Sequence, residues 1–283
     1  MDFAHEVSKE LTGRYRKRIW RPFMSAIKEY ALVAEGDRIA VCISGGKDSM
    51  LLAKCMQELK RHSPLHFELV FLCMDPGYAP ENQRRIEENC RLLGIPVEFF
   101  ETDIFAAIEA MDCSPCYMCA KMRRGYLYRE AQRRGCNKIA LGHHFDDAVE
   151  TLLMSMLYAG QLRGMRPRLR STSVEGMELI RPLYKLREQE IIAWRDENGL
   201  EFLACACRAT RNAELRADGS ADSKRLEMKA LIRRLDAINP DASRNIFRSA
   251  HNAVLDNLNG WKHGGDMHTL LEEFEDRKGD GSI

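Results

Sequence analysis

The segment Ser44-Gly45-Gly46-Lys47-Asp48-Ser49 combines two glycines with hydroxyl groups, an ammonium group and a carboxylate. Residues 38–43 before it alternate in polarity and are rich in β-branched side chains, which predicts a buried strand. Residues 49–61 after it predict an apolar helix. Free N–H groups in a glycine loop that leads into a helix N-terminus favour phosphate, and Lys47 adds a positive charge. The spacing is not that of a Walker A motif, and a chance glycine turn is the alternative interpretation.

A second loop, Gly142-His143-His144-Phe145-Asp146-Asp147, follows a predicted strand at 138–141 and places two carboxylates at the start of a predicted helix. We expect Asp146 and Asp147 to hold Mg²⁺ on the phosphates of a nucleotide. Stabilisation of the two carboxylates by the helix dipole is the alternative explanation. Because both loops directly follow strands, they should face one crevice at the carboxyl ends of a parallel sheet.

Ten cysteines are present, and five of them stand singly in apolar segments, where we predict small buried side chains. These five are Cys42, Cys55, Cys73, Cys90 and Cys136. The others are clustered as Cys113, Cys116-x-x-Cys119 and Cys205-x-Cys207. The Cys116/Cys119 spacing suits a redox pair, a zinc half-site or an iron–sulfur half-site. Three thiolates on a 4Fe-4S cluster would leave one iron open for chemistry.

The elements that must position these residues alternate between short apolar strands and helices along the chain. Strands are expected at 38–43, 67–75, 97–103, 138–141 and 177–183. This pattern predicts an α/β fold, a Rossmann-like parallel sheet covered by helices on both faces. Four parts follow: a basic N-terminal helical segment (1–35), the α/β domain with the cysteine site (36–208), a C-terminal helical segment (209–262) and a loose tail (263–283).

The 283 residues have 45% hydrophobic and 30% charged side chains, as in soluble globular proteins, and a formal net charge of only +1. RNA binding would therefore depend on local basic patches, for which the N-terminal helices, the C-terminal helices and the loop at 160–170 are the candidates. The sequence shows neither a membrane-spanning apolar run nor a signal-peptide pattern, so we expect a cytoplasmic protein without a membrane partner.

The first loop resembles the PP-loop of the ATP-pyrophosphatases. Together with the second loop and the clustered cysteines, it makes the chain similar to the tRNA 2-thiocytidine synthase family. The resemblance implies that ATP and Mg²⁺ are used to adenylate the C2 carbonyl of a tRNA base, most naturally cytidine, and that sulfur is then delivered with a 4Fe-4S cluster. The implied partners are tRNA, a sulfur donor (sulfide or a cysteine desulfurase) and a second copy of the chain in a homodimer.

The same resemblance assigns roles to individual residues. Catalysis would fall to Lys47, Asp48 and Asp146. The nucleotide would be bound by Ser44, Gly45, Gly46, Lys47, Asp48, Ser49, Gly142, His143, Asp147 and Arg123. The cluster would be held by Cys116, Cys119 and Cys207. The one-residue gap in Cys205-Ala-Cys207 and the additional Cys113 depart from the family pattern, so the third ligand remains open between Cys205 and Cys207.

Three other functions are compatible with the same motifs. A PP-loop ligase of the lysidine synthetase type would use the cysteines for structural zinc. A sulfur-relay enzyme would carry a persulfide on Cys119 or Cys207. A non-enzymatic iron–sulfur nucleotide sensor would bind ATP without releasing pyrophosphate.

Overall fold

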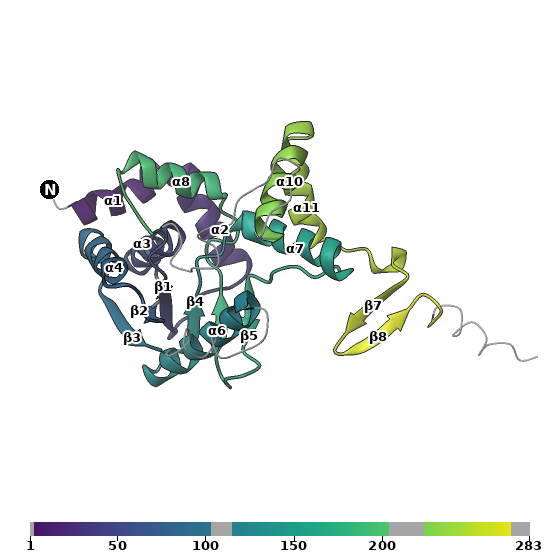
Figure 1. The fold of residues 1–283 in the computed structure, drawn as a ribbon, viewed down its shortest axis with the longest axis horizontal. Helices are drawn as coiled ribbons and strands as arrows, with labels where there is room; N and C mark the ends of the chain where they lie inside the picture. Colours follow the sequence, from purple (N-terminus) through teal and green to yellow (C-terminus); the bar gives the residue numbers. More distant parts are fainter. Residues whose placement is uncertain (1–2, 103–114, 204–223, 273–283) are drawn as a thin grey trace, which may run out of the picture.

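A six-stranded sheet in the order β3-β2-β1-β4-β6-β5 forms the centre of the computed structural model, which describes residues 3–102, 115–203 and 224–272 (Figure 1). The strands are β1 (Arg38–Ile43), β2 (Glu68–Asp75), β3 (Val97–Glu101), β4 (Lys138–Ala140), β5 (Arg168–Arg170) and β6 (Glu178–Ile180). All neighbours are parallel except β5, which pairs antiparallel with β6. The predicted α/β fold is therefore confirmed. The strand β5 was missed, because residues 168–170 were expected to belong to a loop.

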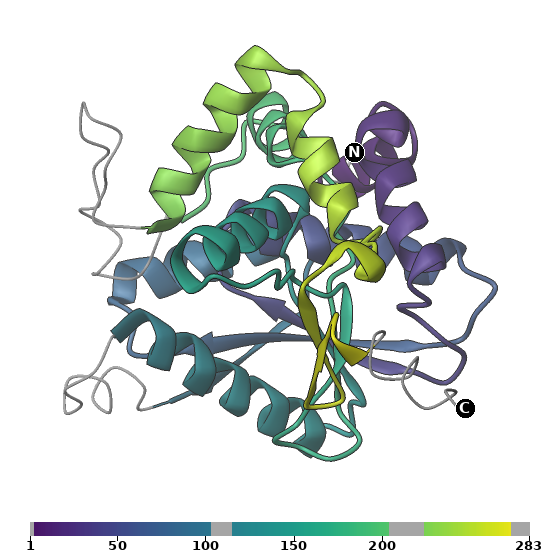
Figure 2. The ribbon, with the colours of Figure 1, turned by 90° about the vertical axis from the view of Figure 1, so that its right-hand side faces the viewer.

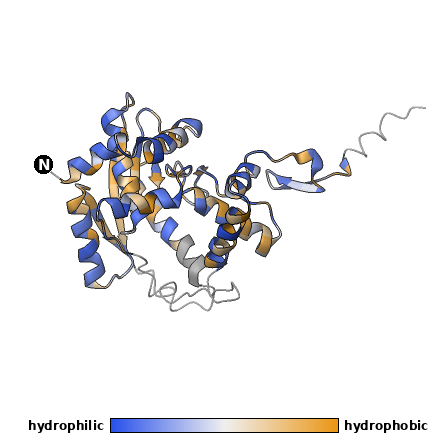
Figure 3. Ribbon diagram, turned by 90° about the horizontal axis from the view of Figure 1, so that it is seen from above, coloured by the Kyte–Doolittle hydropathy of each residue, from blue (hydrophilic) through white to orange (hydrophobic). Residues whose placement is uncertain are grey.

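Helices cover both faces of the sheet, as Figure 2 shows. On one face lie α1 (Phe3–Thr12), α2 (Arg21–Glu29), α3 (Lys47–His62), α4 (Pro80–Leu92) and α8 (Glu188–Glu197); α6 (Pro115–Arg133) covers the other. Strand β1 shows why both faces are apolar. Ile39 and Val41 point into the first core cluster, whereas Ala40 and Cys42 point into the second, as the two-residue repeat of a strand requires. In Figure 3 the central strands are coloured mainly as hydrophobic, and the outer helices carry most of the hydrophilic residues.

The N-terminal helices are part of the main core. Tyr15, Ile19 and Phe23, from the π-helix η1 (Arg16–Trp20) and its neighbours, are completely buried. Arg14 Nη2 lies 2.7 Å from Glu197 Oε2 of α8, and Arg18 donates to the same glutamate at 3.2 Å. Two of the cations that were expected to contact RNA are thus paired within the protein.

The C-terminal part packs on α7 (Phe145–Ala159) through α10 (Lys224–Ile238) and α11 (Ala242–Ser249). Asn239 and Pro240 lie between these two helices. A short η2 helix (Leu255–Asn257) leads to the hairpin β7 (Gly260–His263) and β8 (Asp266–Thr269), which extends away from the body in Figure 1, where a loose tail was expected. In the part of the chain that the structure describes, no helix is both long and apolar enough to span a bilayer. The five single cysteines are free and buried, as predicted.

Candidate functional site

The two candidate loops touch at the carboxyl ends of the neighbouring strands β1 and β4. A Cβ atom added to Gly142 would lie 3.0 Å from the carbonyl carbon of Asp48 and 3.1 Å from the backbone nitrogen of Ser49. Only glycine permits so close an approach of the second loop to the first. The strand order reverses between β1 and β4, and such a switch point is where parallel sheets bind ligands. As predicted, the two loops therefore lie together at the carboxyl edge of the sheet.

The PP-loop is held in shape by its serines and by the conformation of Gly45. Ser49 Oγ accepts from the Ser44 backbone N–H at 3.1 Å and donates to the Gly46 carbonyl oxygen at 2.9 Å. Gly45 has a φ of 81°, and a Cβ there would be only 2.6 Å from Ile86 Cγ1. Helix α3 begins after Gly46 without a side-chain cap, so its first N–H groups and the positive end of its dipole face the crevice. This is an anion-binding geometry.

Lys47 and Asp48 lie at the mouth of this helix N-terminus. The Lys47 ammonium is 3.1 Å from Asp48 Oδ1 and 3.1 Å from Glu188 Oε1, at the start of α8. Burial by itself would lower the pKa of Lys47, but the charges of Asp48 and Glu188 outweigh it and raise the pKa. Asp48 Oδ1 is buried and accepts no hydrogen bond from the described residues. Its contact is the ion pair with Lys47, beside the anion site.

The second loop is organised by a capping box at the start of α7. Asp147 Oδ2 accepts from the His144 backbone N–H at 3.0 Å, and His144 Nδ1 accepts from the Asp147 N–H at 3.4 Å. Burial would raise the pKa of Asp147, but the nearby His144 and Arg225 more than compensate and hold it below its ordinary value. Asp147 thus keeps its charge at the edge of the crevice.

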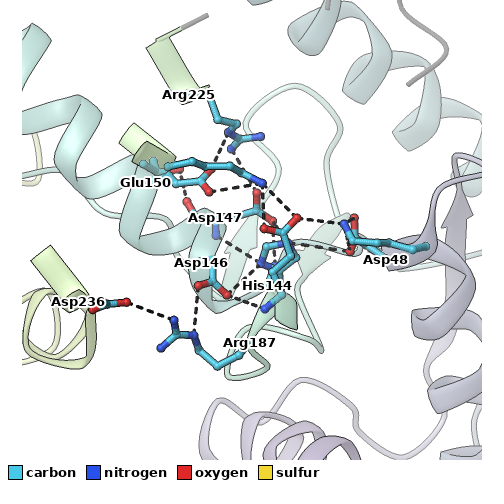
Figure 4. A network of polar contacts seen from close by, with 12 residues as sticks. Asp48, His144, Asp146, Asp147, Glu150, Arg187, Arg225 and Asp236 are labelled. Carbon is cyan, nitrogen blue, oxygen red and sulfur yellow. Dashed lines mark hydrogen bonds and ion pairs between the residues drawn. The ribbon is translucent and has the colours of Figure 1, made fainter. Parts of the chain in front are cut away.

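The Asp146 side chain points away from Asp147 and links the start of α7 to the start of α8 by hydrogen bonds. Its Oδ2 accepts from the Glu188 backbone N–H at 2.6 Å, and its Oδ1 accepts from Arg187 Nε at 3.1 Å. In Figure 4, Arg187 lies between Asp146 and Asp236 of α10. Both carboxylate oxygens of Asp146 therefore accept hydrogen bonds, whereas Asp48 Oδ1 has an ion pair with Lys47 but accepts no hydrogen bond from the described residues.

Two side chains complete the described crevice. Burial lowers the pKa of His143 to about 4, and its Nδ1 has no hydrogen-bond partner in the described chain, so the ring is neutral and able to accept or donate to a ligand. Arg123 of α6 lies against the hydroxyl of Tyr78, just after β2; burial raises the pKa of Tyr78 to about 12, although Arg123 acts in the opposite direction. Arg123 is thus at the same edge of the sheet as the two loops.

Sequence reasoning missed the charges that surround these loops. Glu188 of α8 receives hydrogen bonds from Lys229 of α10, at 2.9 and 3.1 Å. Burial would raise the pKa of Glu188, but Lys229 and Lys47 together hold it at about 2. Arg225, one turn before Lys229, lies 3.0 Å from Glu150 Oε2 and 3.5 Å from Asp147 Oδ1 (Figure 4). The only sequence signal was the basic character of 222–260, which gave no indication of these partners.

The structure describes more of the predicted magnesium site than of the predicted cysteine site. In the ranges 3–102, 115–203 and 224–272, no group of three metal-ligating side chains is present. For Mg²⁺, Asp48 Oδ1 is a suitable donor, because it accepts no hydrogen bond from the described residues. Nucleotide phosphates and water are the natural remaining ligands. Cys116 and Cys119 belong to the first turns of α6, one helical turn apart. Their side chains, like Cys113, Cys205 and Cys207, lie outside the described part.

Comparison with known proteins identifies close relatives. A family model described as the PP-loop domain matches residues 16–214. A protein from Geotalea uraniireducens named tRNA-cytidine(32) 2-sulfurtransferase is 36% identical over 250 residues, covering 87% of this chain and 94% of that protein. The protein of that name from Geobacter sulfurreducens is 38% identical, covering 84% of this chain and 90% of that one. Among solved structures, the U34-tRNA thiolase NcsA from Methanococcus maripaludis with its [4Fe-4S] cluster has the same fold, with a TM-score of 0.64 at 20% identity, covering 90% of this chain and 82% of that one.

Proposed function

The chain belongs to the PP-loop family and, within it, to the tRNA-cytidine(32) 2-sulfurtransferases, and on this premise we propose that it catalyses the ATP-dependent thiolation of a tRNA cytidine at C2. The observation that carries the proposal is the contact of Gly142 with the start of α3. It brings an anion-binding loop, the Asp48 carboxylate and a neutral histidine to one edge of the sheet, next to the helix that contains Cys116 and Cys119.

The first chemical step is adenylation of the base. The C2 oxygen of cytidine attacks the α-phosphate of ATP, and pyrophosphate leaves. The N–H groups of the PP-loop and Lys47 stabilise the charge that develops on the phosphates. Mg²⁺ held by Asp48, with Asp147 next to it, would neutralise further phosphate charge. Asp146 contributes by fixing the start of α8, and thereby Glu188, relative to this loop.

The second step exchanges oxygen for sulfur. Sulfide, supplied directly or by a cysteine desulfurase, adds to the activated C2, and the former C2 oxygen leaves as part of AMP. A 4Fe-4S cluster held by Cys116, Cys119 and Cys207 would supply an iron without a cysteine ligand. His143 and Arg123 would contact the base or the nucleotide.

The tRNA backbone would be bound by exposed cations. Arg163, Arg166 and Arg170 are exposed in the segment between α7 and β6, whereas Arg168 is paired with Glu178 at 2.8 Å. Arg16, Lys17, Arg21 and Lys28 are exposed cations of the N-terminal helices. Because such binding neutralises phosphates, tRNA affinity should fall steeply with added salt. A cytoplasmic location and a homodimer complete the proposal.

The test uses protein purified without oxygen, with ATP, Mg²⁺, sulfide and tRNA. We expect about four irons and four labile sulfides per chain, thiolated cytidine in the digested tRNA, and AMP and pyrophosphate in equal amounts. Cys116→Ala should lose iron and thiolation. Lys47→Met should lose thiolation and keep iron.

The matched control is Cys136→Ala, because Cys136 is a buried single cysteine and its loss should leave the iron in place. An active enzyme with one zinc and no labile sulfide would overturn the cluster, and release of pyrophosphate without any thiolated nucleoside would overturn the sulfur transfer.

A further inference from the structure

Lys47 is the cation nearest the anion-binding start of α3, yet carboxylates surround its ammonium group. Asp48 Oδ1 and Glu188 Oε1 each lie 3.1 Å away, and the Lys47 side chain is only 18% exposed. Glu188 belongs to α8, which packs against α3. To reach a phosphate, the ammonium group must exchange at least one of these carboxylates for the ligand, and the strength of its pairing with Glu188 opposes that exchange.

Glu188 has a second partner in Lys229. The Lys229 ammonium donates to both oxygens of Glu188, at 3.1 and 2.9 Å, and lies 3.8 Å from Glu150 Oε1. Its position is well defined because Met228 and Ile232, on either side of it in α10, are buried against Phe145, Val149 and Leu153 of α7. Helix α10 thus holds a cation against the carboxylate that restrains Lys47.

We propose that Lys229 is a positioning residue for ATP binding: by pairing with Glu188, it allows Lys47 to leave that carboxylate for phosphate. Without Lys229, Glu188 would retain Lys47 more strongly, and its uncompensated negative charge would repel the phosphates. With Lys229 in place, Glu188 remains paired after Lys47 moves. The inference rests on the proposed use of ATP, and it assigns a role in that step to the C-terminal helix.

The test measures the dissociation constant of α,β-methylene-ATP with Mg²⁺ by calorimetry, without tRNA. Lys229→Gln should raise the constant about tenfold, because one full charge next to Glu188 is lost. The double variant Glu188→Gln/Lys229→Gln should return to within about threefold of the unmodified protein, because no carboxylate then holds Lys47. Thermal unfolding of each variant shows whether α10 remains docked.

The matched control is Arg233→Gln. Arg233 is one turn further along α10 and exposed, and no contact with Glu188 is found for it in the described chain. This variant loses the same bulk charge, so its nucleotide affinity should be unchanged. An equal loss in Lys229→Gln and in the double variant would overturn the inference, because Lys229 would then act through helix docking or on the nucleotide itself.

Binding of the analogue by the unmodified protein separates the role of Lys229 from the proposed use of ATP. If the unmodified protein does not bind the analogue, both fail. Suppose that the unmodified protein binds the analogue, and that Lys47→Met weakens this binding whereas Lys229→Gln does not. Only the positioning role is then overturned.

Discussion

Charged side chains gather at both ends of the central strands, but the two groups differ in how completely they are satisfied. At the amino ends of β1 and β4, Lys138 Nζ lies 2.6 Å from Asp37 Oδ2, with side chains 3% and 6% exposed. Asp37 also accepts from Asn137 at 2.8 Å and from the Ala34 N–H at 2.7 Å, while Lys138 donates to the Leu32 carbonyl oxygen. Both charged groups have several partners, so this group of residues is closed.

At the carboxyl ends, the corresponding group is open. Asp48 Oδ1, Glu150 Oε2 and His143 Nδ1 are buried and have no hydrogen-bond partner among the described residues, although ion pairs surround them. Buried polar groups are usually satisfied, so several buried atoms without a hydrogen bond at a strand switch point indicate a ligand site. Burial of charge alone does not distinguish the two ends. Among the described residues, Arg38 Nε is the unsatisfied atom at the start of β1, whereas Asp48, Glu150 and His143 each contribute one at the carboxyl ends.

The largest expected effect is on the closed end. Lys138→Met leaves Asp37 buried without its cation, which should lower the free energy of unfolding by about 3–5 kcal/mol in a urea titration. The affinity of the folded variant for α,β-methylene-ATP should not change. Arg85→Met, which breaks the exposed pair with Glu201, is the control and should stay within about 0.5 kcal/mol of the unmodified protein. A loss below about 1 kcal/mol for Lys138→Met would show that the buried pair of Asp37 and Lys138 does not stabilise the fold.

The sequence predicted the parts of this comparison that depend on local signals. The strand ending at Ile43, the glycine loop after it and the helix that begins beside Asp146 and Asp147 are specified by neighbouring residues. The sequence could not predict the pairing of Lys47 with Glu188, 141 residues away, or of Glu188 with Lys229, a further 41 residues along. These partners are fixed by packing of whole helices, which no local pattern encodes.

Packing of whole helices also explains why the basic segments offer fewer cations to RNA than the sequence suggested. Arg14 and Arg18 were counted with the RNA-binding candidates because charge alone is visible in a sequence. Their partner Glu197 is brought to them by α8, whose apolar face packs on the N-terminal helices through Trp194. Net charge on a segment therefore overstates the number of cations available to a nucleic acid.

A medium effect is expected where the open end is assembled. Gly142→Ala places a methyl group against the backbone of Asp48 and Ser49, so the two loops must separate. We expect a fall in thiolation rate of about tenfold to a hundredfold and a stability loss of about 1–3 kcal/mol. Gly125→Ala is the control, because no atom of the described residues lies within 4 Å of a Cβ at this position of α6 and alanine favours a helix. Unchanged turnover in Gly142→Ala would show that contact between the loops is not needed.

The smallest expected effect concerns Glu150, and it tests whether the open end responds to pH. Burial raises the pKa of Glu150 to about 7 from an ordinary 4.5, although Arg225 and Lys229 oppose this. Folding therefore favours the protonated carboxyl, and its contribution to stability is present below the unfolded pKa and lost as pH rises through 7. From about pH 5 to about pH 8, the protein should lose roughly 1–2 kcal/mol that Glu150→Gln does not lose. Lys138→Met provides the matched background: it weakens the closed end but leaves Glu150 intact, so its stability should fall with the same slope as that of the unmodified protein. Parallel curves for the unmodified protein and Glu150→Gln would show instead that Arg225 and Lys229 satisfy Glu150, and that this carboxylate belongs with the closed end.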